Sequence, residues 1–172
     1  MSAPPDRLVN LLGALAIGLA DRIRGAALDE VGLGGETAAA LVVIGHAPGL
    51  SIDHLGHVLR LSHPGAVRLM DRLTQARLAV RKPAARDRRS VALYLTASGR
   101  SRCDALLKRR HDVLASALEA VPPEERAVLE RVSDAILRGL PDDARSAMTV
   151  CRYCDDQRCP ECPMDGFGAL SG

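Results

Sequence analysis

The sequence predicts a mainly α-helical protein, of the mainly α (α+β) class, with one short β-hairpin. Ala, Leu, Arg and Glu, which favour helices, dominate the composition of the 172 residues. Apolar residues recur every three or four positions over long stretches, which is the helical period. Aromatic residues make up only 2% of the chain, which argues against a β-sandwich or barrel and against stacking of single-stranded bases.

Two helices are expected in the first 46 residues. An apolar stripe predicts a long helix over 7–30, and it comprises Leu8, Leu11, Leu12, Leu15, Leu19, Ile23 and Ala27. Glycines at positions 32, 34 and 35 then break the pattern. A second helix over 36–46 is rich in Ala, Val and Ile, which predicts burial on most sides, and Pro48 and Gly49 follow its end.

The next segment predicts two short helices joined by a tight turn. Ser51 is a good N-cap for a helix over 52–60. Ser62 can cap a further helix that runs to about Arg77, with Pro64 in its first turn, where a missing N–H costs little. This arrangement is a helix-turn-helix. In its second helix, the inward positions are Val67, Met70 and Leu73, and the outward positions include Arg68 and Arg72.

Two strands and a basic loop follow. Leu78 and Val80 predict the first strand, and the alternation over residues 91–95 predicts the second. Between them, residues 81–89 are strongly basic and contain a proline, so a hairpin with an extended tip is expected. A basic hairpin after a helix-turn-helix gives a winged helix-turn-helix.

Two more helices are expected before Pro141. Thr96 caps a helix over about 97–120, and a Pro-Pro-Glu-Glu sequence opens another that extends to about Leu140. The apolar stripes of the first and last helices are larger than a fold of this size can cover alone. They therefore favour a core shared between two subunits.

Charge is segregated along the chain. Residues 60–110 hold fourteen Lys and Arg and three Asp, a net charge of +11, although the whole chain carries only +2. A local basic block favours a polyanionic partner. A solvated face with salt bridges would give the same count, so the structural context decides.

In this region the sequence resembles the MarR family of bacterial transcription regulators, over about residues 8–140. The matching motifs are Asp71-Arg72-Leu73, the run from Leu78 to Pro83, Asp87-Arg88-Arg89-Ser90 and Leu95-Thr96-Ala97-Ser98-Gly99. The resemblance implies a winged helix-turn-helix with long N- and C-terminal dimerisation helices. The expected regions are an N-terminal dimerisation helix (1–35), a DNA-binding region (36–95), C-terminal dimerisation helices (96–145) and an added tail (146–172).

The same resemblance implies the residues that contact double-stranded DNA. In the recognition helix they are Ser62, His63, Pro64, Gly65, Val67, Arg68 and Arg72, and in the wing they are Arg86, Asp87, Arg88 and Arg89. Arg68 is the best candidate for a base or phosphate contact, since arginine pairs bidentately with guanine. Gly65 and Ala66 stand where polar residues are frequent in the family, so DNA shape is expected to matter more.

The family also implies a homodimer on a pseudo-palindromic operator, commonly a repressor that a small-molecule effector releases. Two recognition helices would reach half-sites roughly 34 Å apart. With so few aromatic residues, we expect the effector pocket to be lined by Leu, Ala and Val. No apolar run is long enough to span a membrane and no signal sequence is apparent, so a cytoplasmic protein is expected. No nucleophile motif, phosphate loop or catalytic carboxylate pair indicates an enzyme.

The tail contains the spacing C-x2-C-x4-C-x2-C, formed by Cys151, Cys154, Cys159 and Cys162. In a cytosolic protein this spacing favours a metal over structural disulfides, and four thiolates suit a closed tetrahedral Zn²⁺ site. An iron–sulfur cluster uses the same ligands, and a reversible disulfide switch is a third possibility. The alternative function is therefore a metal- or redox-responsive adaptor whose tail senses the signal or binds a partner protein.

The remaining cysteine and the histidines are also candidate functional residues, but structural roles explain them better. Cys103 lies on an apolar stripe and is expected to be a buried, inert thiol. His54 and His57 lie three residues apart, with His46 upstream, which is compatible with a metal ion. Histidines on a support helix more often pack or face solvent.

Overall fold

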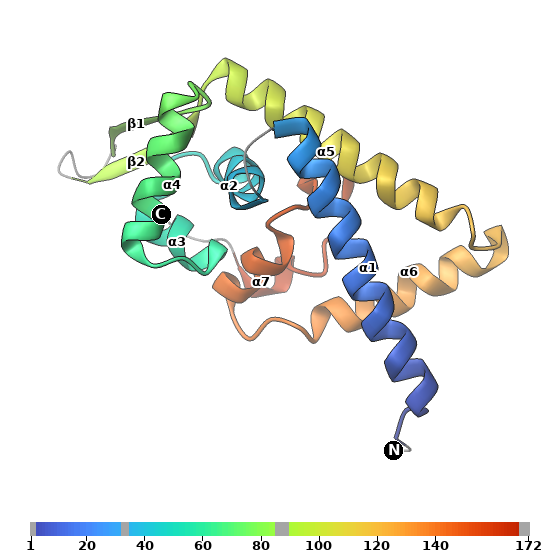
Figure 1. Cartoon of the computed structure of the whole chain (residues 1–172). Helices are drawn as coiled ribbons and strands as arrows, with labels where there is room; N and C mark the ends of the chain where they lie inside the picture. Colours follow the sequence, from blue (N-terminus) through green and yellow to red (C-terminus); the bar gives the residue numbers. More distant parts are fainter. Residues whose placement is uncertain (1–2, 32–34, 85–89, 169–172) are drawn as a thin grey trace.

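The computed structural model describes residues 3–31, 35–84 and 90–168. The predicted mainly helical class and winged helix-turn-helix are confirmed (Figure 1). No described helix is long and apolar enough to cross a membrane. The elements are α1 (Asp6–Val31), α2 (Gly35–His46), α3 (Ile52–Leu59), α4 (His63–Gln75), β1 (Ala79–Pro83), β2 (Val91–Leu95), α5 (Ala97–Leu118), α6 (Pro123–Arg138), α7 (Ala144–Cys151) and the 3-10 turns η1 (Asp156–Arg158) and η2 (Asp165–Phe167).

The core is built around α2, which contacts α1, α3, α4, α5 and β2. Its residues Leu41, Val42 and Ile44 are completely buried, as the apolar composition of this helix predicted. Leu55 from α3, together with Leu69, Met70 and Leu73 from α4 and Leu93 from β2, completes the same cluster. Each such side chain contributes about 1.5–3 kcal/mol of burial free energy, so α3 and α4 rest on a well-packed support.

The predicted helix starts are confirmed by their capping hydrogen bonds. The Ser51 hydroxyl accepts from the His54 amide over 3.2 Å at the start of α3. The Ser62 hydroxyl accepts from the amide of Gly65 over 3.3 Å, and so α4 begins one residue after it. Thr96 performs the same role for α5. These local side-chain contacts satisfy amides that have no partner within the helix.

The hairpin pairs β1 with β2 antiparallel, with Ala79 opposite Leu95 and Pro83 opposite Val91. The predicted loop over 81–89 is too long, because β1 continues to Pro83. A proline is tolerated at this position because it ends an edge strand. The base of the loop is closed by a hydrogen bond from the Ala84 amide to the Ser90 carbonyl over 2.9 Å.

Helix α5 begins in direct contact with the start of the wing. A Cβ atom at Gly99 would lie 1.8 Å from the carbonyl oxygen of Leu78, a distance that no side chain permits. The Thr96 hydroxyl donates to the carbonyl oxygens of Arg77 and Leu78, over 2.7 and 3.2 Å. The glycine thus allows α5 to start against the backbone that leads into β1.

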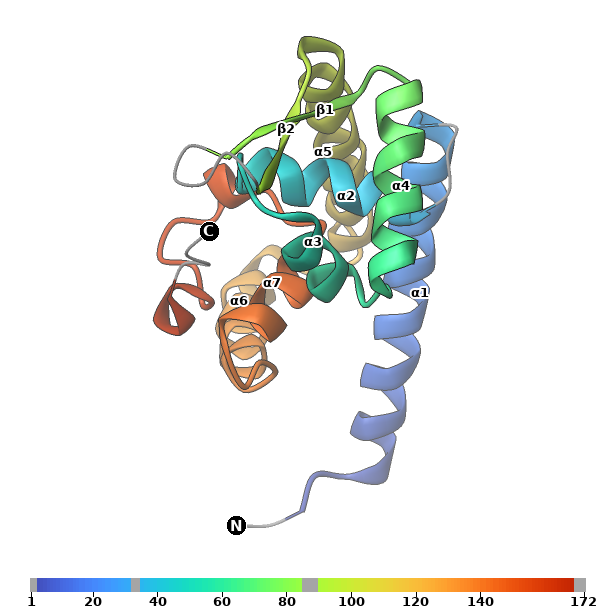
Figure 2. The same ribbon diagram turned by 90° about the vertical axis from the view of Figure 1, so that its left-hand side faces the viewer.

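The first half of α1 and most of α6 leave their apolar stripes uncovered. Figure 2 shows the N-terminal half of α1 extending beyond the rest of the molecule. Only its C-terminal part, around Ala26 and Ala27, is buried. The apolar side chains left at least 41% exposed include Leu8, Leu11, Leu12 and Leu15 of α1 and Val128, Val132 and Ile136 of α6.

Helix α7 was not predicted, because the segment after Pro141 was interpreted from its composition as an irregular tail. Asp143 and Ser146 form a capping box: the Asp143 carboxylate accepts from the Ser146 amide over 2.8 Å, and the Ser146 hydroxyl accepts from the Asp143 amide. The helix packs against α3, and Met148 and Tyr153 reach the central core. The C-terminal segment is therefore attached to the winged domain.

Candidate nucleic-acid interface and cysteine cluster

A tight turn sets α3 and α4 against each other. Arg60 adopts the left-handed conformation with φ of 55°, which ends α3, and the Leu61 amide donates to the Gly56 carbonyl over 2.8 Å. A Cβ at Gly56 would lie 3.4 Å from the Cβ of Ala66, so the two helices approach closely at this point. The glycine and the small alanine fix the separation of support helix and recognition helix.

Helix α4 has one buried face and one exposed face. Ala66, Leu69, Met70 and Leu73 are buried against the core. The predicted DNA-contact residues Ser62, His63, Pro64, Arg68 and Arg72 are exposed. The structure therefore places five of these residues, two of them arginines, where a nucleic acid could reach them.

Two of the predicted contact residues differ from the others. Gly65 and Val67 are only half-buried and not fully exposed, because they lie at the border of the packed face. A Cβ at Gly65 would lie 3.2 Å from the Ser62 hydroxyl, so this glycine also leaves room for the N-cap. Gly65 and Val67 therefore offer less surface than the prediction assumed.

Arg81 connects the recognition helix to the wing and was not among the predicted site residues. Its guanidinium donates to the Asp71 carboxylate over 2.8 Å and to the Val67 carbonyl over 3.4 Å. Because Arg81 lies on β1, these bonds fix the orientation of the hairpin relative to α4. Asp71 belongs to the motif that carried the resemblance, but its partner ten residues away was visible only in three dimensions.

His63 at the start of α4 is fixed by the support helix. Its Nδ1 lies 2.6 Å from a carboxylate oxygen of Asp53 on α3, and both side chains are largely exposed. His63 is thus positioned by a carboxylate before any DNA contact.

The wing residues Arg86, Asp87, Arg88 and Arg89 lie outside the described residues, so their predicted contacts stay predictions. At the base of the wing, the Lys82 ammonium lies 5.3 Å from the centre of the Tyr94 ring, across the hairpin. This cation–π contact holds a positive charge at the strand surface. The described part of the hairpin therefore adds a basic side chain beside α4.

The four tail cysteines are brought together. Cys151 ends α7, and the Cys154 amide donates to the Cys151 carbonyl over 2.7 Å, which forms the first Cys-x-x-Cys turn. Cys159 and Cys162 follow η1. All four residues line one cavity of about 350 Å³. The sequence spacing thus predicted a cluster, and the structure gathers all four side chains around it.

The thiols of this cluster interact in pairs. A hydrogen bond from Cys151 lowers the pKa of the Cys154 thiol to about 6, helped by the positive charge of Arg110. The same hydrogen bond and burial raise the pKa of Cys151. Burial and the neighbouring thiol of Cys162 raise the pKa of Cys159. The Arg110 guanidinium lies 3.7 Å from the Cys154 sulfur, so the cluster includes a cation from α5.

The thiols are paired but do not form a finished metal site. Within residues 3–31, 35–84 and 90–168, no group of three or more His, Cys, Asp or Glu side chains has the arrangement that would hold a metal ion. The histidines have other contacts: His57 Nδ1 lies 2.9 Å from the Asp53 carbonyl, and His46 lies 3.4 Å from the Asp156 carboxylate.

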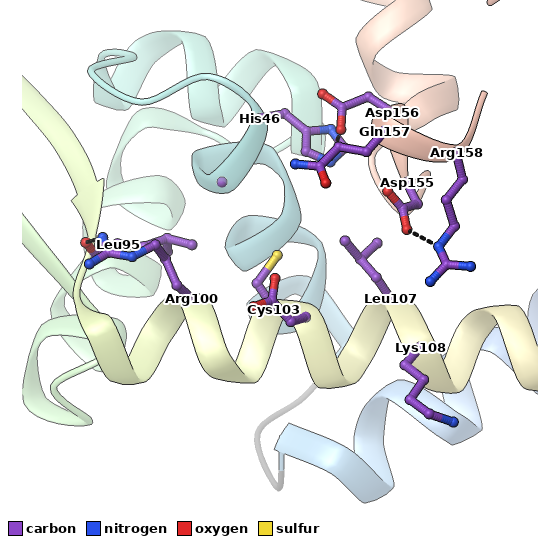
Figure 3. A pocket seen from close by; sticks show the side chains of 12 residues that line it. His46, Leu95, Arg100, Cys103, Leu107, Lys108, Asp155, Asp156, Gln157 and Arg158 are labelled. Atoms are coloured by element: carbon purple, nitrogen blue, oxygen red, sulfur yellow. Dashed lines mark hydrogen bonds and ion pairs between the residues drawn. The ribbon is translucent and has the colours of Figure 1, made fainter. Parts of the chain in front are cut away.

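A larger cavity, of about 590 Å³, lies between the end of α2, α5 and η1. Figure 3 shows Cys103 and Leu107 on α5 facing this cavity, with Asp155 paired to Arg158 on the opposite side. Burial, followed by nearby carboxylates, raises the pKa of the Cys103 thiol to about 12. The buried thiol that the sequence predicted is confirmed.

A second cavity lies between the C-terminal part of α1 and the winged domain. It measures about 510 Å³ and is lined by apolar residues, including Leu28 and Leu59, but also by Arg24, Glu36 and Tyr153. The expected lining of Leu, Ala and Val is therefore wrong for this cavity. The polar side chain of Tyr153 was not expected in the cavity wall, because nothing in the sequence indicated that the C-terminal segment packs at this position.

Comparison with known proteins gives a family model that matches part of the chain, and a shared fold. A family model described as MarR family matches residues 31–90. That range contains α2, α3, α4 and β1, which carry the exposed arginines and their support. No curated protein matches the chain.

Solved structures match most of the chain. A MarR-family protein from Bacillus stearothermophilus has 25% identity and a TM-score of 0.69, over 80% of this chain and 98% of that chain. Wild-type MarR from E. coli, in its apo form, has 21% identity and a TM-score of 0.65, over 80% and 98%. CouR from Rhodococcus jostii RHA1, bound to p-coumaroyl-CoA, has 23% identity and a TM-score of 0.61, over 79% and 93%.

Proposed function

We propose that this chain is a transcription regulator of the MarR family, whose model matches residues 31–90, and that it acts as a homodimeric, sequence-specific DNA-binding repressor and not as an enzyme. The observation that carries the proposal is the exposed face of α4, where Arg68 and Arg72 project beside the basic hairpin. In this proposal α4 enters the major groove and the wing follows the adjacent backbone.

The two arginines have separable roles in the proposal. Arg68 lies near the N-terminal part of α4, the part of a recognition helix that contacts base edges, so it reads sequence. Arg72 lies one turn further and contacts phosphate, which positions the protein without specifying bases. Arg81, held by Asp71, keeps the wing in register with both.

Dimerisation is supported by the uncovered apolar faces of α1 and α6. Leu12 is 46% exposed and Val132 is 49% exposed in the single chain, although both belong to helical apolar stripes. A cavity of about 550 Å³ lined by Leu15, Leu19 and Leu114, among others, continues this surface between α1, α5 and α6. A second copy of the chain would cover it and would present two recognition helices to a pseudo-palindromic operator.

Control of DNA binding is proposed to act through the cavity between α1 and the winged domain. The CouR structure, which shares this fold, holds p-coumaroyl-CoA. In this chain the cavity wall combines apolar residues such as Leu28 and Leu59 with the polar side chains of Arg24, Glu36, Arg152 and Tyr153. A small amphipathic effector that enters it would change the position of α1, and hence the separation of the two recognition helices.

The DNA-binding proposal is tested by selecting binding sites from randomised duplex DNA and measuring affinity by fluorescence anisotropy. Arg68→Ala is expected to cost about 1–3 kcal/mol at the selected site and to relax the preference at one base pair. Arg72→Ala should weaken binding to all DNA sequences alike. It should also reduce the slope of log affinity against log salt concentration by about one. Arg109→Ala on α5 is the charge-matched control and should bind normally. Normal binding by both α4 variants would exclude this interface.

A further inference from the structure

The cysteine cluster has a chemistry that DNA recognition does not use. Four thiols that line one cavity are an unusual accumulation of soft ligands, because the only other cysteine in the chain, Cys103, lies in a different cavity. η1 lies between their two Cys-x-x-Cys turns along the chain. Disulfides are rare in cytosolic proteins, whereas this ligand set and spacing suit a tetrahedral metal ion.

We propose that Cys151, Cys154, Cys159 and Cys162 bind one Zn²⁺ ion per chain, and that the ion fastens residues 144–162 to helices α2, α3 and α5. Zinc suits this set because four thiolates satisfy its tetrahedral coordination without a water ligand. Each thiol that is protonated releases its proton to solvent as it binds the metal. Without metal, Cys151 pairs with Cys154 and Cys159 pairs with Cys162. Zinc binding would move the second pair closer to the first so that all four sulfurs coordinate one ion.

Arg110 supports an anionic centre at this place. A Zn²⁺ ion with four thiolates carries a net charge of −2, which is costly to leave uncompensated at a partly buried site. The Arg110 guanidinium already approaches the Cys154 sulfur, and its Nε is buried without a hydrogen-bond partner among the described residues. An unsatisfied buried donor beside a sulfur cluster fits a site that becomes more negative when the metal is bound.

Contacts with α5, α2 and α3 connect the cluster to the rest of the molecule. Arg110 joins Cys154 to α5, and His46 at the end of α2 lies 3.4 Å from the Asp156 carboxylate in η1. Figure 3 shows His46 and Asp156 next to each other above α5. Helix α7, which ends at Cys151, packs against α3. Zinc binding would therefore hold the whole segment against the support of the recognition helix.

The first experiment measures zinc binding by the full-length, reduced, chelator-treated protein. Zn²⁺ is titrated in competition with a chromophoric chelator, and Co²⁺ is used as a spectroscopic probe of tetrahedral thiolate coordination. We expect one ion per chain. Cys154→Ser and Cys162→Ser should each lose more affinity than the roughly 10–100-fold typical of outer-shell changes. Cys103→Ala is the matched control, and it should bind as the unmodified protein does.

Two further measurements test the role of the Arg110 charge and the attachment of the tail segment to the rest of the protein. Arg110→Gln should weaken Zn²⁺ binding, whereas Arg109→Gln, at an exposed neighbouring position, should not. Hydrogen exchange at the amides of α7 should slow on addition of Zn²⁺ in the unmodified protein and remain fast in Cys154→Ser. Because neither readout involves DNA, failure here is distinguishable from failure of the proposed regulator function.

Several results would overturn the proposal. Substoichiometric or weak Zn²⁺ binding would exclude the site, as would full binding by the Cys154→Ser and Cys162→Ser variants. Iron and acid-labile sulfide in protein purified without oxygen would assign an iron–sulfur cluster in its place. Reversible disulfides in a protein that binds no metal would make the segment a thiol switch.

Discussion

Asp71 on α4 accepts a hydrogen bond of 2.8 Å from Arg81 on β1, and this bond ties the recognition helix to the wing. The two side chains are 50% and 30% exposed, so the pair contributes at most about 1 kcal/mol to folding. Its effect on geometry is larger than its effect on stability. Arg81 also holds the Val67 carbonyl, so a single guanidinium fixes two points of α4 relative to the hairpin.

Asp71→Asn should therefore weaken DNA binding more than it weakens folding. The expected loss is about 1 kcal/mol in binding free energy, or roughly fivefold in affinity, with little change in thermal midpoint. Affinity is measured by anisotropy and stability by circular dichroism. Asp112→Asn, which removes the exposed Lys108–Asp112 pair on α5, is the control and should alter neither. An equal affinity for Asp71→Asn and the unmodified protein would contradict a positioning role.

Gly99→Ala should prevent stable folding of the winged domain. The added methyl group would lie 1.8 Å from the Leu78 carbonyl oxygen, so α5 or β1 must move, at an expected cost above about 3 kcal/mol. Urea unfolding measures the loss. Gly25→Ala on α1, where a methyl group meets open space, should be neutral or stabilising by about 0.5–1 kcal/mol. Near-native stability of Gly99→Ala would show that the close approach is not required.

Leu12→Glu should convert the dimer into a monomer. The substitution puts a charge into the apolar stripe of α1, where a partner would bury it at a cost of several kcal/mol. Sedimentation velocity measures the mass of the particle. Ile17→Glu is the control, because Ile17 is 66% exposed and lies outside the stripe. Dimers that survive in Leu12→Glu would exclude this face as the interface.

Asp143→Asn should remove a pH-dependent part of the stability of α7. Hydrogen bonds from the backbone and hydroxyl of Ser146 lower the pKa of the Asp143 carboxyl. The stabilisation is therefore present above the unfolded-state pKa of about 3.9 and is lost as the pH falls through the lower folded-state value. Thermal midpoints of the two proteins should differ at pH 5 and converge as the pH is lowered below the folded-state pKa of Asp143. A constant difference across that range would contradict the capping role of the charge.

Cys103 should resist alkylation in the native state. Its pKa of about 12 leaves roughly one thiolate in ten thousand at pH 8, and the side chain is buried. Iodoacetamide followed by peptide mapping should modify the tail cysteines of the metal-free protein, including the exposed Cys159, and spare Cys103. In denaturant all five cysteines should react. Native labelling of Cys103 at the rate of Cys159 would contradict its burial.

The parts of the fold that depend on local signals were predictable. Ser51, Ser62 and Thr96 are followed by apolar periodicity, so capping and amphipathicity located α3, α4 and α5 within about two residues. The exposure of Arg68 and Arg72 followed from the same helical period. These predictions succeeded because each needed only residues within one or two turns of one another.

The parts that depend on distant contacts were not predictable. Helix α7 was missed for a different reason: the composition of the segment obscured a local signal, the capping box of Asp143 and Ser146, that the sequence contained. The Asp71–Arg81 bond joins two elements, and the approach of Arg110 to Cys154 spans 44 positions. Their geometry is set by how the elements pack, which periodicity does not encode.

Because the first half of α1 is exposed in the single chain, its helical order depends on the concentration of the protein. Residues 6–18 are all exposed in the single chain, and a helix of about thirteen residues is only marginally stable in water by itself. In the proposed dimer a second copy covers this segment, so the segment becomes ordered in a bimolecular step whose extent depends on protein concentration. Dilution would melt it while the winged domain stays folded. Expression level would then set the fraction of molecules able to span two half-sites.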